Sequence, residues 1–208
     1  MASFRQLLDR HAPLLVLDAC SAKIQVGWLA HVGKMQWATS TEESGFGLFT
    51  CLEALAVNPT DARGFIFCDG PGSILGIRTS AITVRAWRVL NPQPVFGYHS
   101  LELVAHFLGD PKLSVIADAR RDAWHCASLD TPLRRVQTAD LPGNLATPTG
   151  FRNWTPLPPH VIEVPYSIEE MLPQLMDKDL LRDAAEPDAF LHEEPRYVTW
   201  TPAIHRAP

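Results

Sequence analysis

A glycine-rich stretch between an apolar run and a helix-like run could hold a phosphate group. Gly70-Pro71-Gly72-Ser73-Ile74-Leu75-Gly76 follows the strand-like residues 64–68. Free N–H groups at a helix N-terminus bind anions, so Gly70, Gly72, Ser73 and Gly76 form a candidate ligand loop. The spacing fits neither a Walker A loop nor a dinucleotide-binding loop, and Ser73 is not in a nucleophile elbow. A sharp turn that lets helix and strand pack closely is therefore the favoured interpretation.

A second candidate is the acid and hydroxyl that follow the apolar run 14–17. Asp18 ends this run, and Ser21 lies three residues further along. An acid followed by a hydroxyl could contact a metal-bound phosphate. Aspartate at a turn between strands more often forms an Asx turn, and we favour that structural role.

The remaining reactive side chains do not form a catalytic set. His125 and Cys126 are neighbours in a strand-like run, so their side chains point to opposite faces. His99 and His106 are seven residues apart, with no third ligand at zinc spacing. The pair Arg120-Arg121 could bind a phosphate or the carboxylate of a partner, although a solvated turn is favoured.

The composition predicts a soluble globular chain in the cytoplasm. Its 208 residues are 46% hydrophobic, which is enough for a core. The net charge of -5 gives no overall attraction for nucleic acid, so RNA binding would need a local patch or a basic partner. We find no signal peptide and no membrane-spanning run, and the four cysteines contain no C-x-x-C pair, which favours free thiols.

The first half of the chain reads as a strand meander followed by two helices and a strand. Strands are expected at 14–18, 24–29 and near 34–39, with a helix after a capping sequence at 40–43. A strand ending at Cys68 and a helix over about 76–90 follow. This order predicts an α/β fold with a mixed sheet rather than a simple Rossmann domain.

Both helices carry features of contact surfaces. In the first, small residues at Gly47, Cys51 and Ala54 form a stripe that another helix could approach. The second is apolar on several sides, which predicts that it is buried on several sides. Arg78, Arg85 and Arg88 form a narrow cationic strip beside its apolar positions.

The second half resumes the alternation of strands and helices and then becomes proline-rich. A strand is expected at 95–98, a helix at 100–108 and strands at 113–117 and 123–129. Twelve of the eighteen prolines lie from Pro132 onward, so much of 142–159 should be irregular. Later we expect a short strand at 161–164, a helix at 167–181 and an edge strand at 197–200. The break at 91–94 predicts two lobes, 1–94 and a smaller, proline-rich 95–208.

Four motifs in order resemble one protein family. Residues 15–21 (LVLDACS) resemble its opening strand and "DTST" turn, and residues 70–78 (GPGSILGIR) resemble its "GPGSFTGLR" signature. Residues 97–102 (GYHSLE) resemble "GVSSLE", and residues 118–121 (DARR) match "DARR". The family is TsaB, also called YeaZ, the accessory protein of bacterial tRNA threonylcarbamoyladenosine synthesis. The resemblance spans about residues 14–129, and residues 194–198 weakly resemble the closing strand of the family.

This resemblance implies an actin-like ATPase (ASKHA, RNase H-like) fold with two lobes. It implies a non-catalytic scaffold that pairs with TsaD, the catalytic paralogue, or with itself as a homodimer, and is joined by the ATPase TsaE. The chain would contact tRNA only as part of the complex. No cofactor would be required, and ATP or ADP would not bind tightly. The interface would lie on the two helices, at Phe46, Gly47, Phe49, Cys51, Ala54, Ile77, Arg78, Ala81, Val84, Arg85 and Arg88.

Two departures from the family and two other functions stay open. Ile74-Leu75 replaces Phe-Thr in the signature, and residues 43–46 (ESGF) replace the usual "HSE" stretch. The H-x-x-x-H metal pair of the catalytic paralogue is missing. The alternative is a small ATPase or sugar-kinase-like enzyme that uses Asp18 and the glycine loop. A third possibility is a homodimeric binding module that has lost its original role.

Overall fold

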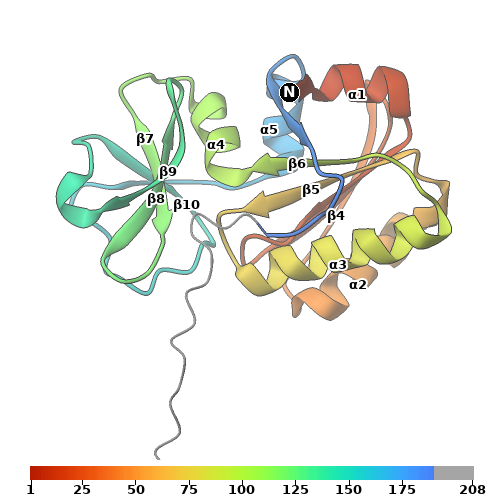
Figure 1. The fold of residues 1–208 in the computed structure, drawn as a ribbon, viewed down its shortest axis with the longest axis horizontal. Coiled ribbons are helices and arrows are strands. Elements are labelled where there is room, and N and C mark those ends of the chain that lie inside the picture. The colour runs from red at the N-terminus through yellow and green to blue at the C-terminus, as the bar shows by residue number, and fades with distance from the viewer. Residues whose placement is uncertain (190–208) are drawn as a thin grey trace, which may run out of the picture.

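The computed structural model describes residues 1–189 as an α/β protein with two mixed sheets and five α-helices (Figure 1). The strands are β1 Ala2–Ser3, β2 Leu14–Asp18, β3 Ile24–His31, β4 Lys34–Ser40, β5 Gly64–Gly70, β6 Val95–His99, β7 Ser114–Asp118, β8 Ala123–Ser128, β9 Thr131–Gln137, β10 Leu145–Pro148, β11 Ile162–Val164 and β12 Asp179–Asp183. The helices are α1 Phe4–His11, α2 Ser44–Leu55, α3 Ile74–Leu90, α4 Ser100–Leu108 and α5 Ile168–Leu175.

The larger sheet has seven strands in the order β1-β12-β6-β5-β2-β3-β4. Its centre is parallel, because β5 pairs in parallel with both β2 and β6, while β2, β3 and β4 form the predicted antiparallel meander. Figure 1 shows α2 and α3 together on one face of this sheet and α1 on the other. Every residue of β2 is buried, since both faces of the strand are covered.

Alternate residues of β2 contribute to two separate cores. Leu15 and Leu17 belong to the core beneath α2 and α3, whereas Leu14 and Val16 belong to the core shared with α1, α4 and α5. This division follows from the period of two along a strand. The helix α3 is therefore fixed to the sheet through one half of its circumference, and its other half is left for solvent or a partner.

The smaller sheet has five strands in the order β11-β10-β7-β8-β9. Its strands β7, β8 and β9 form a second antiparallel meander, and β10 adds to it in parallel. Helix α4 contacts β7 and β8 and also packs on α5, so it lies between the two sheets (Figure 1). A small third core gathers here around Trp124 and Ile116.

The larger sheet continues past residue 94. The strand that begins at Val95 pairs with β5, and β12 returns from the C-terminal part to pair with β6. The domain division 1–94 and 95–208 stays a prediction, but the larger sheet draws strands from both sides of it. No helix in residues 1–189 combines the length and the apolar character that crossing a bilayer requires.

Several local predictions are wrong. The helix expected at 167–181 ends at Leu175, and residues 179–183 instead form the strand β12. Ser40 ends β4 rather than capping α2, whose N-cap is Glu43 without a side-chain bond. The sequence reading missed the helix α1 and the strands β9 and β10. The edge strand expected at 197–200 lies outside the described residues.

Candidate functional site

Asp18 is fully buried at the end of β2, and its carboxylate accepts hydrogen bonds from three residues of the protein itself. The hydroxyl of Tyr166 donates to Oδ2 at 2.6 Å, the hydroxyl of Tyr98 donates to the same oxygen, and the N–H of Cys20 donates to Oδ1 at 3.0 Å. Burial, together with the charge of Asp18, raises the pKa of both tyrosines well above the usual value. In this conformation the carboxylate has no exposed surface with which to contact a phosphate.

Ser21 is also occupied locally, which supports the structural role favoured from the sequence. Its hydroxyl donates to the carbonyl oxygen of Lys23 at 2.9 Å and accepts from the N–H of Lys23. The Asp18–Cys20 bond has the Asx-turn pattern expected for aspartate between two strands. The side chains of Asp18 and Ser21 are therefore both engaged in hydrogen bonds within the protein.

The glycine loop packs directly on the Ala19–Cys20 turn. A Cβ atom added at Gly76 would lie 1.9 Å from the carbonyl oxygen of Ala19, and one added at Gly72 would lie 2.3 Å from that of Cys20. Gly72 also has a φ of +152°, which other residues rarely adopt. These glycines are needed because the start of α3 approaches the backbone after β2 too closely for any side chain.

Two N–H groups of this loop are already used within the protein. The N–H of Ser73 donates to the carbonyl oxygen of Cys20 at 2.7 Å, and the hydroxyl of Ser73, the N-cap of α3, accepts from the N–H of Gly76. Gly70 has a φ of +131°, where the chain turns out of β5. The packing explanation thus accounts for all three glycines, and anion binding by the other N–H groups stays a prediction.

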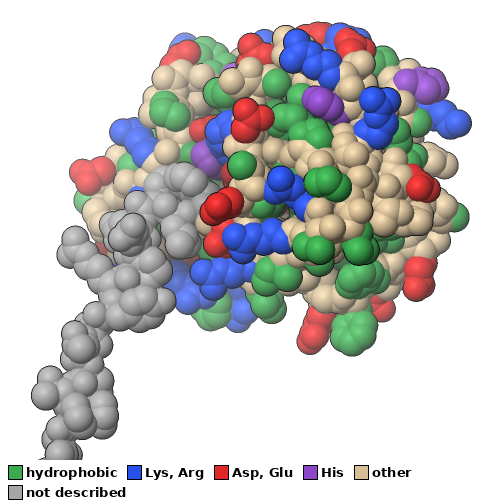
Figure 2. Space-filling model, turned by 45° about the vertical axis from the view of Figure 1, so that its right-hand side comes forward, with side chains coloured by type: hydrophobic (Ala, Val, Ile, Leu, Met, Phe, Trp, Pro, Cys, Tyr) green, Lys and Arg blue, Asp and Glu red, His purple; other side chains and the backbone are tan. Residues whose placement is uncertain are grey.

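The surface formed by α2 and α3 carries most of the exposed hydrophobic side chains. Of the eleven large hydrophobic residues that are exposed in the described chain, seven lie on these two helices. They are Phe46, Phe49, Ile74, Leu75, Ile82, Val89 and Leu90. Figure 2 shows hydrophobic and Lys/Arg side chains together along the lower edge of the molecule, where Figure 1 places these helices. We call this surface the α2–α3 face.

Six predicted interface residues lie on or beside this face. Phe46, 73% exposed, and Phe49 project from α2, and Ala54 is exposed on the same helix. Arg78 and Arg85 are exposed on α3. Arg88 is partly buried, because its guanidinium donates to the carbonyl oxygen of Ala185.

The other five predicted interface residues are buried in the core and do not form part of a contact surface as predicted. Ile77, Ala81 and Val84 are at most 1% exposed and face the sheet. Cys51 is buried, and a Cβ at Gly47 would lie 2.4 Å from the side chain of Ile24, so these two small residues of α2 let the helix pack closely on β3. Both sides of α3 are apolar in sequence, so the helical wheel alone did not show which side meets the sheet.

The sequence reading did not assign Ile74, Leu75, Ile82, Val89 and Leu90 to the interface. The signal that could have found them is the combination of helical spacing and charge. Leu75, Arg78, Ile82, Arg85 and Val89 recur every three or four residues. Arginine is rarely fully buried, so the apolar stripe that shares its side of the helix is the exposed one.

A network of charged side chains between the two sheets was also not predicted. Arg182 of β12 donates to both carboxylate oxygens of Asp69, at 3.0 and 2.9 Å, and lies 3.5 Å from Glu102. His99 Nδ1 lies 2.8 Å from the Arg182 guanidinium and 3.2 Å from the Glu102 carboxylate. Asp69 and Arg182 are far in sequence from His99 and Glu102, and only the return of β12 to the sheet brings Arg182 to the others.

The pKa values of the two carboxylates in this network are shifted in opposite directions, although burial raises both. Burial raises the pKa of Asp69 despite the nearby guanidinium of Arg182. Burial would also raise the pKa of Glu102, but hydrogen bonds from His99 and from the Leu133 N–H lower it to about 2. Glu102 is therefore firmly ionised and ties α4 to the start of β9.

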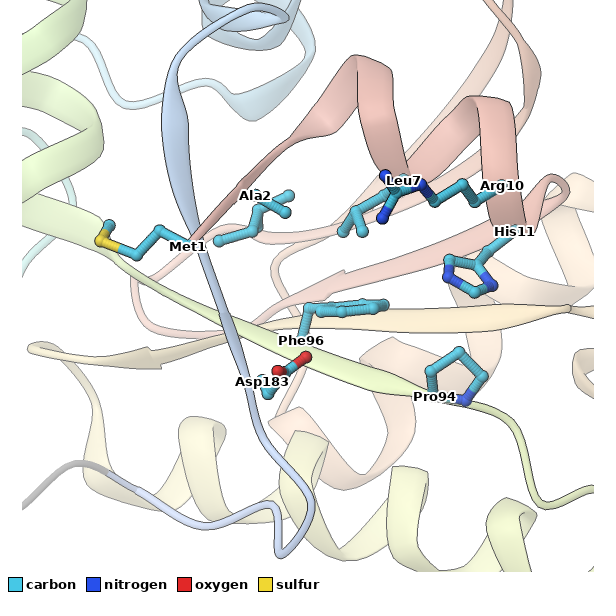
Figure 3. Close-up of a pocket in the computed structure, with 9 residues that line it drawn as sticks. Met1, Ala2, Leu7, Arg10, His11, Pro94, Phe96 and Asp183 are labelled. Carbon is cyan, nitrogen blue, oxygen red and sulfur yellow. The ribbon is translucent and has the colours of Figure 1, made fainter.

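Two cavities lie near the N-terminus. One, about 430 Å³, is lined by His99, Glu102 and Arg182 of the network and by the turn between β8 and β9. The other, about 400 Å³, lies between α1 and strands β6 and β12. Figure 3 shows the ring of Phe96 on its floor and the side chains of Arg10, His11 and Asp183 around it. Neither cavity contains a residue predicted as a ligand site from the sequence.

Comparison with known proteins gives matches in structure but not in sequence. No family model and no curated protein matches the sequence. The structure is similar to YeaZ from Pseudomonas aeruginosa, with a TM-score of 0.56 and 20% identity over 76% of this chain and 88% of that one. The chain has the fold of YeaZ. That fold is the actin-like fold expected from the sequence.

A second solved structure, an uncharacterized protein with similarity to peptidase YeaZ from Pseudomonas aeruginosa, covers more of the chain. Its TM-score is 0.61 and its identity 16%, over 93% of this chain and all of that one. The YeaZ fold therefore extends over both sheets rather than over the larger one alone. At 16% and 20% identity, this similarity shows the fold alone.

Proposed function

We propose that this chain belongs to the TsaB/YeaZ family and is a non-catalytic accessory subunit in the threonylcarbamoylation of tRNA. It would pair through the α2–α3 face with a TsaD-type catalytic paralogue, and a TsaE-type ATPase would join the complex. The observation that carries this proposal is the α2–α3 face itself, on a chain with the YeaZ fold and the four ordered motifs.

The composition of the face suits a partner that binds and dissociates. Exposed apolar patches on folded proteins mark contact sites, and arginine is enriched where such sites meet a partner. Here Arg78 and Arg85 alternate with Leu75, Ile82 and Val89 on one side of α3. The arginines keep the free chain soluble, while the hydrophobic side chains gain free energy when a partner covers them.

The alternative, a small ATP-using enzyme, has less support from the geometry. It needs Asp18 to act on a nucleotide or its metal ion, yet this side chain has no exposed surface and its oxygens already accept three hydrogen bonds. Freeing it would require breaking bonds to a buried carboxylate, each of which contributes about 1.5–3 kcal/mol. A supporting role is therefore the better explanation of this region.

The deciding experiment measures binding to a purified TsaD-type protein by calorimetry. Ile82→Asp should weaken association by about 2 kcal/mol or more, because it places an unpaired charge in the contact. Val32→Asp is the matched control, since Val32 is also exposed but lies outside α2 and α3. It should leave the affinity unchanged.

A modification assay with TsaD-type and TsaE-type proteins completes the test. Addition of the wild-type chain should raise the yield of threonylcarbamoylated tRNA, and Ile82→Asp should lose that gain. Wild-type protein that neither binds the TsaD-type partner nor raises the yield would contradict the proposal. Saturable hydrolysis of ATP that disappears in Asp18→Ala would instead establish the enzyme alternative.

A further inference from the structure

Two arginines lie over one exposed tryptophan on the smaller sheet. The guanidinium carbon of Arg152 is 3.8 Å from the ring centroid of Trp154, and that of Arg120 is 4.7 Å from it. Trp154 is 54% exposed, and both arginines are exposed. Arg121 follows Arg120 in the turn between β7 and β8, and we call these four residues the Arg–Trp cluster.

The loop that carries Arg152 and Trp154 is fixed at both ends. The Gly150 carbonyl oxygen accepts from the Ala22 N–H at 2.8 Å, and the ring of Phe151 packs edge-on against Tyr166. At the other end, the N–H groups of Trp154 and Thr155 both donate to one carboxylate oxygen of Asp118. The exposed tryptophan is therefore held in place by a buried neighbour and by backbone hydrogen bonds.

The turn that carries Arg120 and Arg121 has a strained backbone. Arg120, Arg121 and Asp122 all have positive φ, at 59°, 55° and 56°. Each such residue costs free energy, and strained segments of this kind gather at functional sites. The turn is held by the Arg120 N–H, which donates to Asp118, and by Arg135, whose guanidinium donates to the Arg120 carbonyl oxygen.

Within residues 1–189, no ion pair of the cluster arginines with a nearby acid is found. Asp118 accepts from three backbone N–H groups, which lower its pKa although burial would raise it. Asp122 accepts from the hydroxyl of Thr138. Two guanidinium groups therefore lie over one exposed aromatic ring, and the exposed Arg121 follows one of them in the same turn, on a chain whose overall charge is -5.

We propose that the Arg–Trp cluster is a contact site for a single-stranded segment of RNA. Nucleotide bases stack on aromatic rings and on guanidinium planes, and arginine edges bind phosphates. An acidic peptide would be attracted by the arginines but would gain little from a stacked tryptophan. The combination of an aromatic ring and guanidinium groups thus favours a ligand that has both planar bases and phosphates.

This inference rests on the proposed function for its choice of RNA, and it names the part of the chain that the RNA meets. The overall negative charge requires a local patch of this kind if the chain touches RNA at all. The two proposals use different surfaces, the Arg–Trp cluster and the α2–α3 face. They can therefore fail separately.

The test is fluorescence anisotropy with a labelled RNA hairpin that has the sequence of a tRNA anticodon arm, at several KCl concentrations. Arg120→Gln and Arg152→Gln should each reduce the slope of log affinity against log salt by about one. Trp154→Ala should weaken binding about tenfold, because a stacking platform is lost, and Trp154→Phe should retain most of it. Arg63→Gln is the control, since Arg63 is exposed just before β5.

Unchanged binding by the cluster variants, or no binding of the hairpin by the wild-type chain with and without a TsaD-type partner, would overturn the inference. An equal loss in Arg63→Gln would overturn it too, because general charge would then explain the binding. If the cluster variants lose affinity for the TsaD-type protein and keep it for RNA, the cluster is a protein contact instead. Loss of RNA binding with normal TsaD association supports the inference, and RNA binding without TsaD association refutes only the proposed function.

Discussion

The two sides of α3 are both apolar, but they differ in what accompanies the hydrophobic residues. The inner side, with Ile77, Ala81 and Val84, has no charged residue and is almost completely buried. Its polar members are small, and the Ser80 hydroxyl donates to the Gly76 carbonyl oxygen of its own helix. The outer side interleaves Ile82 and Val89 with arginines.

This difference shows how one helix can serve a core and a surface at once. An inner side without charge suits permanent burial, since an unpaired charge in a core is expensive. An outer side that mixes arginine with aliphatic residues is stable in water and can also be covered by a partner. The α2–α3 face is thus built for a contact that forms after the chain has folded.

The largest difference between the two sides of α3 is expected when an arginine is introduced on each of them. Ala81→Arg should destabilise folding by about 3–5 kcal/mol, because it forces a charge into the core between the helix and the sheet. Ala86→Arg should change the free energy of unfolding by less than about 0.5 kcal/mol, since Ala86 is exposed. Thermal and urea unfolding of both variants measures the difference.

Ala86→Arg should nevertheless weaken binding to the TsaD-type partner if the outer side is the contact. Equal destabilisation by the two substitutions would mean that both sides of α3 belong to the core. An Ala81→Arg variant as stable as the wild type would contradict the burial of the inner side. The two-sided helix requires that Ala81→Arg be strongly destabilised while Ala86→Arg keeps the stability of the wild type.

A second pair of variants tests the close packing at the beginning of α3. Gly76→Ala should destabilise the chain by about 2–3 kcal/mol, because its methyl group would overlap the Ala19 carbonyl oxygen and the backbone has to shift. Gly45→Ala on α2 is the control, since no atom lies within 4 Å of its added Cβ. It should stabilise the helix by up to about 1 kcal/mol.

Chemical denaturation at fixed pH gives both values. If Gly76→Ala is as stable as the wild type, the glycine is kept for a ligand rather than for packing, and the favoured explanation of the loop is wrong. Isothermal titration of both variants with ATP and Mg²⁺ would then be the next measurement. The packing explanation expects no selective change in nucleotide binding.

Local pattern was enough to place most elements of the larger sheet. The strand 14–18 has the predicted bounds, because a continuous apolar run ending in an acid leaves little alternative. Helix α4 has the predicted bounds of 100–108, since it begins directly after a strand and ends at Gly109 in the left-handed conformation. The order of elements and the motifs then indicated the fold.

Contacts between distant residues were the part that the sequence did not reveal. The strand β12 was read as the end of a helix, because Leu180 and Leu181 continue an apolar spacing and only pairing with β6 makes them a strand. The side of α3 that meets the sheet depends on how close Gly76 comes to Ala19. The Arg–Trp cluster joins a turn with a loop more than thirty residues later, and the sequence analysis singled out only its Arg120-Arg121 pair.

Two glutamates, Glu102 inside the molecule and Glu53 on its surface, differ in the same way as the two sides of α3. Glu102 lies between the two sheets beside His99 and Arg182, whereas Glu53 is exposed on α2. A charge that is held by hydrogen bonds in the folded chain has a different pKa there than in the unfolded chain, so it makes stability depend on pH. An exposed charge does not.

The sign for Glu102 follows from its lowered pKa. Its folded value is about 2, below the usual 4.5, so its contribution to stability is fully present above about pH 4.5 and is lost as the pH falls toward 2. Asp69 acts in the opposite direction, because burial raises its pKa. The informative quantity is therefore the difference between the wild type and Glu102→Gln, which keeps an oxygen to accept from the Leu133 N–H.

We expect Glu102→Gln to be less stable than the wild type by an amount on the order of 1 kcal/mol at neutral pH, allowing for partial exposure to solvent. The gap should narrow as the pH is lowered from about 4.5 to 2, because the wild type loses the same interaction by protonation. Glu53→Gln should follow the wild type at every pH. A gap that stays constant across this range would mean that the pKa of Glu102 is not lowered, and that His99 and Arg182 do not hold its charge between the two sheets.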